Sequence, residues 1–180
     1  PDIIMVGEMR DRDTAEIAIQ AALTGHLVLS SLHTNDASTA ISRLVDMGVE
    51  RFMVASSING VLSQRLVRRI CNLCKTECQP EPDILRQYFF WPEGMTLPNL
   101  YLGAGCKGCG GTGYKGRLGI HEFLRITPQI REAILRDQTN DEIRRLAESQ
   151  GFRNMRYDGF KKALLGLTTI DEVLRATGEE

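Results

Sequence analysis

The residues with the clearest chemistry are four cysteines in two pairs, Cys71-x-x-Cys74 and Cys106-x-x-Cys109. A C-x-x-C turn can direct two thiolates at one cation, so two such pairs predict a closed tetrahedral site of the kind that holds structural zinc. The plainer alternative is that the four residues are buried or disulfide-bonded. Cys78 is left over; we expect a free thiol, with replacement of Cys74 as a ligand as the alternative. Four thiolates leave no position for water, so this zinc would supply rigidity rather than catalysis.

Two polar residues follow predicted strands near the start of the chain. The run Pro1–Glu8 is apolar and ends in a carboxylate, and a second apolar run, Leu27–Leu32, is followed directly by His33. Ligands gather at the carboxyl ends of parallel strands, so we expect Glu8 and His33 to face one crevice. His26 begins the second strand and should lie at its opposite end. The alternatives are that Glu8 is an ordinary surface carboxylate and His33 a satisfied core residue.

Composition limits the classes of function. The chain has 180 residues with a net charge of −1, and its acidic and basic residues are interspersed, which disfavours nucleic-acid binding. No run reaches the ~18 apolar residues of a membrane span, and no signal peptide is evident, so we expect a soluble product that is not secreted. An odd cysteine count with metal spacing favours a reducing compartment. Because the chain opens with Pro inside an apolar run, we interpret it as a fragment.

The pattern of elements predicts an α/β fold in three segments. Alternating strands and helices over residues 1–70 predict a parallel, doubly wound sheet. Residues 71–114 lack a regular apolar period and form a small module held by its metal. Residues 115–180 form a strand and a small helical subdomain. The individual elements are a strand over 2–8, a helix capped by Asp11-Arg12-Asp13-Thr14 through Leu23, a strand over 27–32, a helix capped by Thr34-Asn35-Asp36, a helix over 51–62, a strand over 65–70, a strand or hairpin over 117–126, and short helices of which Thr127-Pro128 opens the first and a Thr169-x-x-Glu172 capping box the last.

Three stretches carry a resemblance to the secretion ATPase superfamily. The chain is most similar to the type II secretion assembly ATPases, with the type IV pilus extension ATPases as close relatives. Met9 departs from the usual Ile, an apolar exchange. The stretches resemble the family's Walker B segment, histidine box and following strand; they are Pro1-Asp2-Ile3-Ile4-Met5-Val6-Gly7-Glu8-Met9-Arg10-Asp11, Leu23-Thr24-Gly25-His26-Leu27-Val28-Leu29-Ser30-Ser31-Leu32-His33-Thr34-Asn35 and Gln64-Arg65-Leu66-Val67-Arg68.

The resemblance implies the C-terminal part of a RecA-like P-loop NTPase with a tetracysteine zinc insert. Glu8 would be the Walker B glutamate acting at Mg²⁺ and its waters, His33 would lie near the γ-phosphate of ATP, and Arg10 would position the strand end and the subunit boundary. The implied assembly is a homohexamer, cytoplasmic and peripheral at the inner membrane, which works with inner-membrane platform and cytoplasmic-anchor proteins to build a pseudopilus or pilus.

Some family motifs are absent from the sequence. It contains no G-x-x-x-x-G-K-[ST], so the isolated chain should not hydrolyse ATP. The acidic box that the family carries before its Walker B segment is absent too. Gly103-x-Gly105-x-x-Gly108 matches a dinucleotide fingerprint by letters only; between the cysteine pairs it predicts a flexible loop of the metal module.

Two further hypotheses remain open. Cys106-x-x-Cys109-x-Gly111-x-Gly113 resembles one knuckle of the Hsp40 chaperone zinc domain, which would make the chain a protein-binding module without hydrolysis. Arg65, Arg68 and Arg69 form either a phosphate or partner patch or, as we expect, a solvated strand face.

Overall fold

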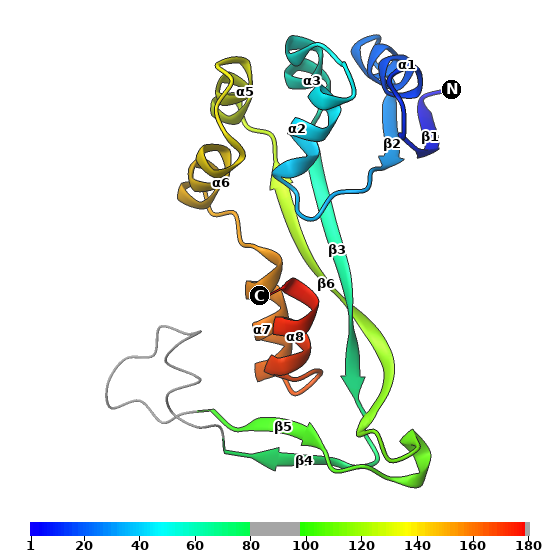
Figure 1. Ribbon diagram of the computed structural model, residues 1–180, viewed down its shortest axis with the longest axis vertical. Helices are drawn as coiled ribbons and strands as arrows, with labels where there is room; N and C mark the ends of the chain where they lie inside the picture. Colours follow the sequence, from blue (N-terminus) through cyan, green and yellow to red (C-terminus); the bar gives the residue numbers. More distant parts are fainter. Residues whose placement is uncertain (80–97, 179–180) are drawn as a thin grey trace. The chain divides into compact units, whose positions relative to one another are not determined.

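The computed structural model describes residues 1–79 and 98–178 (Figure 1). Two units emerge from the contacts: Pro1–Ser63 with Glu122–Arg153, and Gln64–His121 with Asn154–Glu180. The elements are β1 (Ile3–Glu8), α1 (Arg12–Leu23), β2 (Leu27–Ser31), α2 (Thr39–Asp46), α3 (Arg51–Ser57), β3 (Gly60–Ile70), β4 (Lys75–Cys78), β5 (Leu100–Gly103), the 3-10 helix η1 (Lys107–Cys109), β6 (Tyr114–Arg125), α5 (Pro128–Leu135), α6 (Asn140–Ser149), α7 (Met155–Leu164) and α8 (Ile170–Thr177).

In the first unit, β1 and β2 form a parallel pair connected by α1. Ile3 lies opposite Leu27, and the register shifts once, between Val6 and Glu8, before Glu8 meets Ser31. The predicted cap of α1 is confirmed, because the Asp11 side chain accepts a hydrogen bond from Thr14 N at 2.9 Å. Parallel pairing places the carboxyl ends of both strands at the same edge.

Helices α1, α2, α3, α5 and α6 share the core of this unit. Their apolar faces enclose one buried cluster together with the end of β6. Its members are Ala15, Ile19, Ala37, Ile41, Leu44, Val49, Val54, Ala55, Leu124, Ile126, Ile130, Ala133, Ile134, Ile143 and Ala147.

The third predicted strand differs from expectation. The helix expected over 51–62 ends at Ser57, and Gly60 already begins β3, which pairs with β6 rather than with the β1–β2 pair. At Gly60 an added Cβ would lie 2.8 Å from the Phe123 ring, so the approach of β6 leaves no room for a side chain there. The described residues therefore form three two-stranded sheets instead of one doubly wound sheet over residues 1–70. Of the two alternatives predicted over 117–126, the strand is the one observed, as part of β6.

In the second unit, the β4–β5 hairpin packs on the helix pair α7 and α8. The hairpin is antiparallel, and Leu100 of β5 packs against a buried cluster from both helices, made of Phe160, Ala163, Ile170 and Val173. Gly166, in the turn between the helices, has φ +67° and lies close to the Lys75 and Tyr101 side chains. The metal module and the C-terminal helices thus share contacts. Among the described residues, no helix has the length and apolarity needed to cross a membrane.

Candidate functional site

The ends of β1 and β2 bring Glu8, His33 and Arg10 together. Nε2 of His33 lies 2.8 Å from Glu8 Oε1, and Nε of Arg10 lies 2.5 Å from Glu8 Oε2. Hydrogen bonds tie the strand ends to each other: Ser31 Oγ donates to the Gly7 carbonyl at 2.6 Å. The carboxylate predicted on one strand and the imidazole predicted after the next are therefore neighbours.

Exposure differs sharply within this group. The Glu8 side chain is 19 % exposed, whereas His33 is 88 % and Arg10 is 75 % exposed. Glu8 Oε1 is shielded from solvent and accepts no hydrogen bond of good geometry within the part of the chain that the structure describes. A carboxylate oxygen in this state can accept a hydrogen bond from a ligand donor. The exposed side chains of His33 and Arg10 contact the same carboxylate.

His26 lies at the other end of β2, as its sequence position indicates. Its Nδ1 is 3.0 Å from the Ala21 carbonyl oxygen and 3.3 Å from Thr24 Oγ1, in the turn between α1 and β2. These contacts belong to the turn, so His26 has a structural environment distinct from that of His33.

The loop after His33 is fixed by its own residues. The expected helix cap lies here, but α2 starts at Thr39, later than Thr34-Asn35-Asp36 indicates. Asp36 Oδ1 accepts from Thr39 N at 2.9 Å and from Ser38 Oγ at 2.7 Å. Burial alone would raise the pKa of Asp36, but these hydrogen bonds and the nearby Arg144 lower it below its ordinary value.

Two residues remote in sequence also hold this loop, and the sequence did not identify them. Glu122 Oε1 accepts a 2.6 Å hydrogen bond from Ala37 N, and Arg144 of α6 donates to Asp36 Oδ2 at 3.0 Å. The sequence did hold a signal for Glu122. It lies two positions from both Ile120 and Leu124, so all three side chains share one face of β6, and that face is buried.

The four paired cysteines converge in the second unit. All four Sγ atoms lie within 4.8 Å of one another. The Cys71–Cys106 and Cys74–Cys109 distances are both 3.9 Å, and the Cys106–Cys109 distance is 3.7 Å. A tetrahedral zinc with Zn–S bonds of about 2.3 Å separates its sulfurs by about 3.8 Å. All five cysteines are free thiols, so the disulfide alternative does not apply.

The backbone around this cluster favours a thiolate at Cys109. The N–H groups of Cys106 and Gly113 donate to its sulfur at 3.2 and 3.3 Å, and these bonds lower its pKa to about 6. Burial raises the pKa of Cys74 to about 12, so a thiolate there needs a cation as partner. The donor set and spacing therefore fit a structural metal ion.

Cys78 lies outside the cluster. It ends β4 opposite Leu100, and burial raises the pKa of its thiol. Within the described residues it belongs to no group that could hold a metal ion, which supports the choice of Cys74.

Glycines allow two backbones to cross beside the cluster. An added Cβ at Gly103 would meet the Gly113 carbonyl oxygen at 1.9 Å, and one at Gly113, where φ is +77°, would meet the Gly103 oxygen at 2.3 Å. Gly105 (φ +88°) is similarly close to Gly111. The Gly-rich segment is therefore part of the metal module, and its glycines serve close packing rather than phosphate binding.

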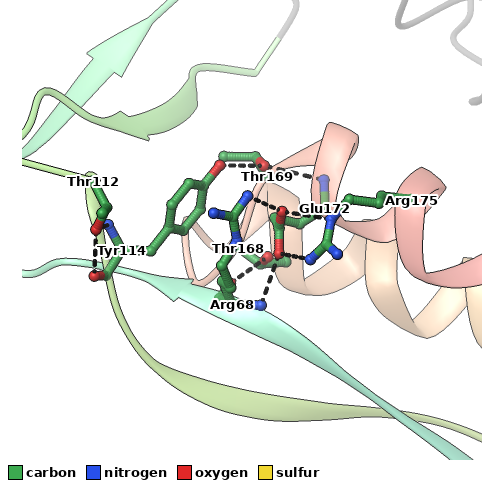
Figure 2. A network of polar contacts seen from close by, with 7 residues as sticks. All are labelled: Arg68, Thr112, Tyr114, Thr168, Thr169, Glu172 and Arg175. Atoms are coloured by element: carbon green, nitrogen blue, oxygen red, sulfur yellow. Dashed lines mark hydrogen bonds and ion pairs between the residues drawn. The ribbon is translucent and has the colours of Figure 1, made fainter.

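A buried carboxylate, Glu172, joins α8 to β3 (Figure 2). Its side chain is 2 % exposed; Arg68 N donates to Oε2 at 3.0 Å, and Arg175 Nη2 donates to Oε2 at 2.7 Å. The Arg68 guanidinium bonds Oε1 and stacks 4.2 Å from the centroid of the Tyr114 ring, whose hydroxyl lies 3.0 Å from Thr169 Oγ1.

This network corrects two expectations. Arg68 is not simply part of a solvated strand face, because it pairs with Glu172, and Arg65 bonds the Ala176 carbonyl. Only half of the predicted capping box forms at α8: Thr169 Oγ1 accepts from Glu172 N at 3.3 Å, but the Glu172 carboxylate is engaged by the two arginines.

Comparison with known proteins gives consistent matches over the chain. The family described as "Type II/IV secretion system protein" matches residues 1–175. The type IV pilus assembly ATPase PilB of Thermus thermophilus is 53 % identical, covering 99 % of this chain and 20 % of that protein. The type II secretion system protein E of Pseudomonas aeruginosa is 48 % identical, covering 100 % of this chain and 35 % of that protein.

Solved structures agree at the level of the fold. A crystal structure of the pilus retraction motor PilT with bound ADP aligns with a TM-score of 0.65 at 26 % identity, covering 100 % of this chain and 40 % of that one. The Legionella pneumophila ATPase DotB aligns with a TM-score of 0.63 at 23 % identity, covering 96 % of this chain and 37 % of that one. The chain thus spans about a fifth to a third of the length of the curated relatives named above.

Proposed function

Because the chain belongs to the type II/IV secretion system protein family, we propose that it is part of a hexameric motor ATPase that drives pseudopilus assembly and type II protein secretion. In this proposal residues 1–70 belong to the C-terminal part of the RecA-like ATPase core. Residues 71–114 form the zinc-binding insert, and residues 115–180 form the C-terminal strand and helical subdomain. Each compact unit contains residues from more than one of these segments, so the segments are functional divisions of the sequence and not compact structural units.

The observation that carries the proposal is the contact of Glu8 with His33 and Arg10 at neighbouring parallel strand ends. Glu8 orients the attacking water, while His33, whose Nε2 lies against Glu8 Oε1, presents its exposed ring to the phosphates. Arg10 fixes the other carboxylate oxygen. Mg²⁺, when bound with ATP, neutralises charge on the phosphates in the transition state.

The tetracysteine site has a different role in this proposal. Cys71, Cys74, Cys106 and Cys109 hold one Zn²⁺ in a closed shell, which stabilises the fold around it and takes no part in hydrolysis. The isolated chain is inactive, because its sequence contains no phosphate-binding G-x-x-x-x-G-K-[ST] loop.

Type IV pilus assembly is a second candidate for the same motor, favoured by the 53 % identity to the Thermus protein. In either case we propose a cytoplasmic homohexamer, peripheral at the inner membrane, acting on platform and cytoplasmic-anchor proteins. Deleting the gene in a strain with both systems, and scoring secretion and piliation separately, distinguishes the two.

The proposal is tested with Glu8→Gln in the intact protein. Loss of a carboxylate that acts on the transition state should lower ATP turnover by about 10²-fold or more, while nucleotide affinity stays within a few-fold. Glu16→Gln is the matched control, because Glu16 forms a surface ion pair with Arg12 on α1. Turnover by Glu8→Gln close to that of the control would remove Glu8 from its proposed role.

A further inference from the structure

Glu122 is a buried carboxylate that the proposed hydrolysis does not use. It is 6 % exposed and lies in β6 between the buried residues Ile120 and Leu124. A charge in such a place is costly unless it is hydrogen-bonded. It accepts a 2.6 Å bond from the backbone N–H of Ala37, which is itself completely buried. Charge-assisted bonds of this kind are stronger than neutral ones.

The segment held by Glu122 is the one that carries His33. Thr34, Asn35 and Asp36 separate His33 from Ala37. On the other side, Ser31 ends β2 and is fixed to β1 through its bond to the Gly7 carbonyl. The backbone that bears His33 therefore runs between two fixed points, the paired end of β2 and the Ala37 amide.

The position of the His33 ring depends mainly on its backbone. Its side chain is 88 % exposed, and among the described residues its Nε2 approaches Glu8 Oε1 at 2.8 Å. An exposed side chain has access to several rotamers, so its position depends on where the backbone places its Cα. A shift of the loop by even one ångström would alter the Nε2–Oε1 contact.

We infer that Glu122 is a positioning residue that sets the placement of His33 against Glu8 by anchoring, at Ala37, the loop that carries His33. Its consequence for turnover rests on the proposed function, whereas its consequence for the loop does not. The acceptor oxygen, rather than charge alone, performs this role, because the bond is made to one buried N–H. Arg144 supports the same loop from α6 through Asp36, so Glu122 and Arg144 hold adjacent residues from two elements.

Three substitutions separate the possible roles of Glu122. Glu122→Gln keeps an acceptor oxygen at the same reach, Glu122→Asp keeps the charge but withdraws the acceptor, and Glu122→Ala removes both. Glu132→Ala is the matched control, because Glu132 is an exposed residue paired with Arg136 on α5.

The first measurements use the chain itself: hydrogen exchange of the Ala37 amide and the NMR signal of the His33 ring. We expect exchange at Ala37 to be at least tenfold faster in the Asp and Ala variants, with a displaced His33 signal, and both to be near wild-type in the Gln variant. A His33 signal that is unchanged in the Asp variant despite faster exchange would overturn the inference, because Glu122 would then anchor only α2. Should the Ala variant fail to fold, the Asp and Gln pair decides the question.

The second measurement is steady-state kinetics of the intact protein. Glu122→Asp should lower kcat by about tenfold with KM for ATP within threefold, and Glu122→Gln should restore kcat to within threefold of wild type. A Gln variant no better than Asp would overturn the role of the acceptor oxygen. Full turnover by His33→Ala would overturn the proposed role of His33 instead, while the NMR and exchange results still decide how Glu122 acts.

Discussion

At the ends of β1 and β2, polar side chains meet at an open surface, where His33 is 88 % exposed beside a largely buried Glu8. The tetracysteine site is more enclosed: Cys71 is 1 % exposed, the other three cysteines are partly buried, and backbone N–H groups donate to the Cys109 sulfur. The first arrangement exposes the His33 and Arg10 side chains and depends on loops for its geometry. The second is closed, and its geometry is fixed by turns and crossing glycine backbones.

The difference has a consequence for stability. A substitution at an exposed site has little effect on folding, whereas the tetracysteine cluster is bonded to the backbone packed around it. Gly113 donates to the Cys109 sulfur and accepts from Cys71 N at 2.9 Å, and the next residue, Tyr114, stacks on Arg68. We therefore expect metal binding to stabilise α7 and α8 as well as the cysteine loops.

Metal removal should have the largest effect. Structural zinc contributes about 10 kcal/mol or more of binding free energy in small zinc modules, and that energy is folding energy. Chelation, or Cys109→Ser, should abolish hydrogen-exchange protection in the β4–β5 hairpin and reduce it in α7 and α8, while the β1–β2 region keeps its protection. Elemental analysis should find one zinc per chain.

Cys78→Ser is the control for the metal experiment, because Cys78 lies outside the cluster and the variant should retain its zinc. Zinc release by Cys78→Ser together with retention by Cys74→Ser would show that the ligand set is wrong. Unchanged protection of α7 and α8 after metal loss would show that the hairpin and the helices fold independently.

Glu172→Ala should have the next largest effect, again in the second unit. The carboxylate satisfies the Arg68 backbone N–H and pairs with two guanidinium groups that are themselves about half exposed. Because the arginines can turn to water, we expect a loss of about 2 kcal/mol in the free energy of unfolding, less than for a fully buried ion pair. Asp171→Ala, its exposed neighbour in the first turn of α8, should cost less than 1 kcal/mol in the same denaturant titration. Equal losses of stability in the two variants would show that the effect comes from a negative charge near the N-terminus of α8, and not from the contacts of Glu172 with the two arginines.

Acid should weaken this network over a defined range. Although burial opposes it, hydrogen bonds from Arg68 and Arg175 lower the pKa of Glu172 from 4.5 to about 2. A carboxylate with a lowered folded-state pKa stabilises the protein fully above its unfolded pKa, and this stabilisation is lost as the pH falls from about 4.5 towards 2. The stability difference between wild type and Glu172→Gln should therefore shrink over that range. Acid also changes other groups, so the two proteins are compared at each pH; a constant difference would contradict the lowered pKa of Glu172.

Short-range patterns predicted most of what is local in this molecule. The C-x-x-C spacing defines each half of the cysteine cluster, and the Asp11 cap of α1 depends on residues a few positions away. The meeting of Glu8 with His33 was also predictable, because parallel strands joined by one helix align their carboxyl ends.

Long-range pairing was not predictable in the same way. Arg68 and Glu172 are 104 positions apart, and Glu122 is 85 positions from Ala37. The pairing of β3 with β6 joins two segments far apart in the sequence, and no periodicity in either segment encodes it. A charged residue at a position whose strand neighbours are apolar, such as Glu122, indicates a buried polar contact. Its partner, however, can be identified only from the fold.

The smallest effect expected is on the open site, and it compares two histidines of one strand. His33→Ala in the intact protein should lower turnover by about tenfold, with an unchanged melting temperature and unchanged ADP affinity, because the exposed ring contributes little packing and ADP has no γ-phosphate. His26→Ala should instead lower stability by about 1 kcal/mol, since its Nδ1 lies 3.0 Å from the Ala21 carbonyl in the turn before β2, and should leave the turnover of folded protein unchanged. Each variant serves as the other's control, because both remove one imidazole flanking the same strand. The prediction would be wrong if His26→Ala were stably folded but inactive while His33→Ala kept its activity. The nucleotide would then lie at the His26 end of β2 and not at the end near Glu8.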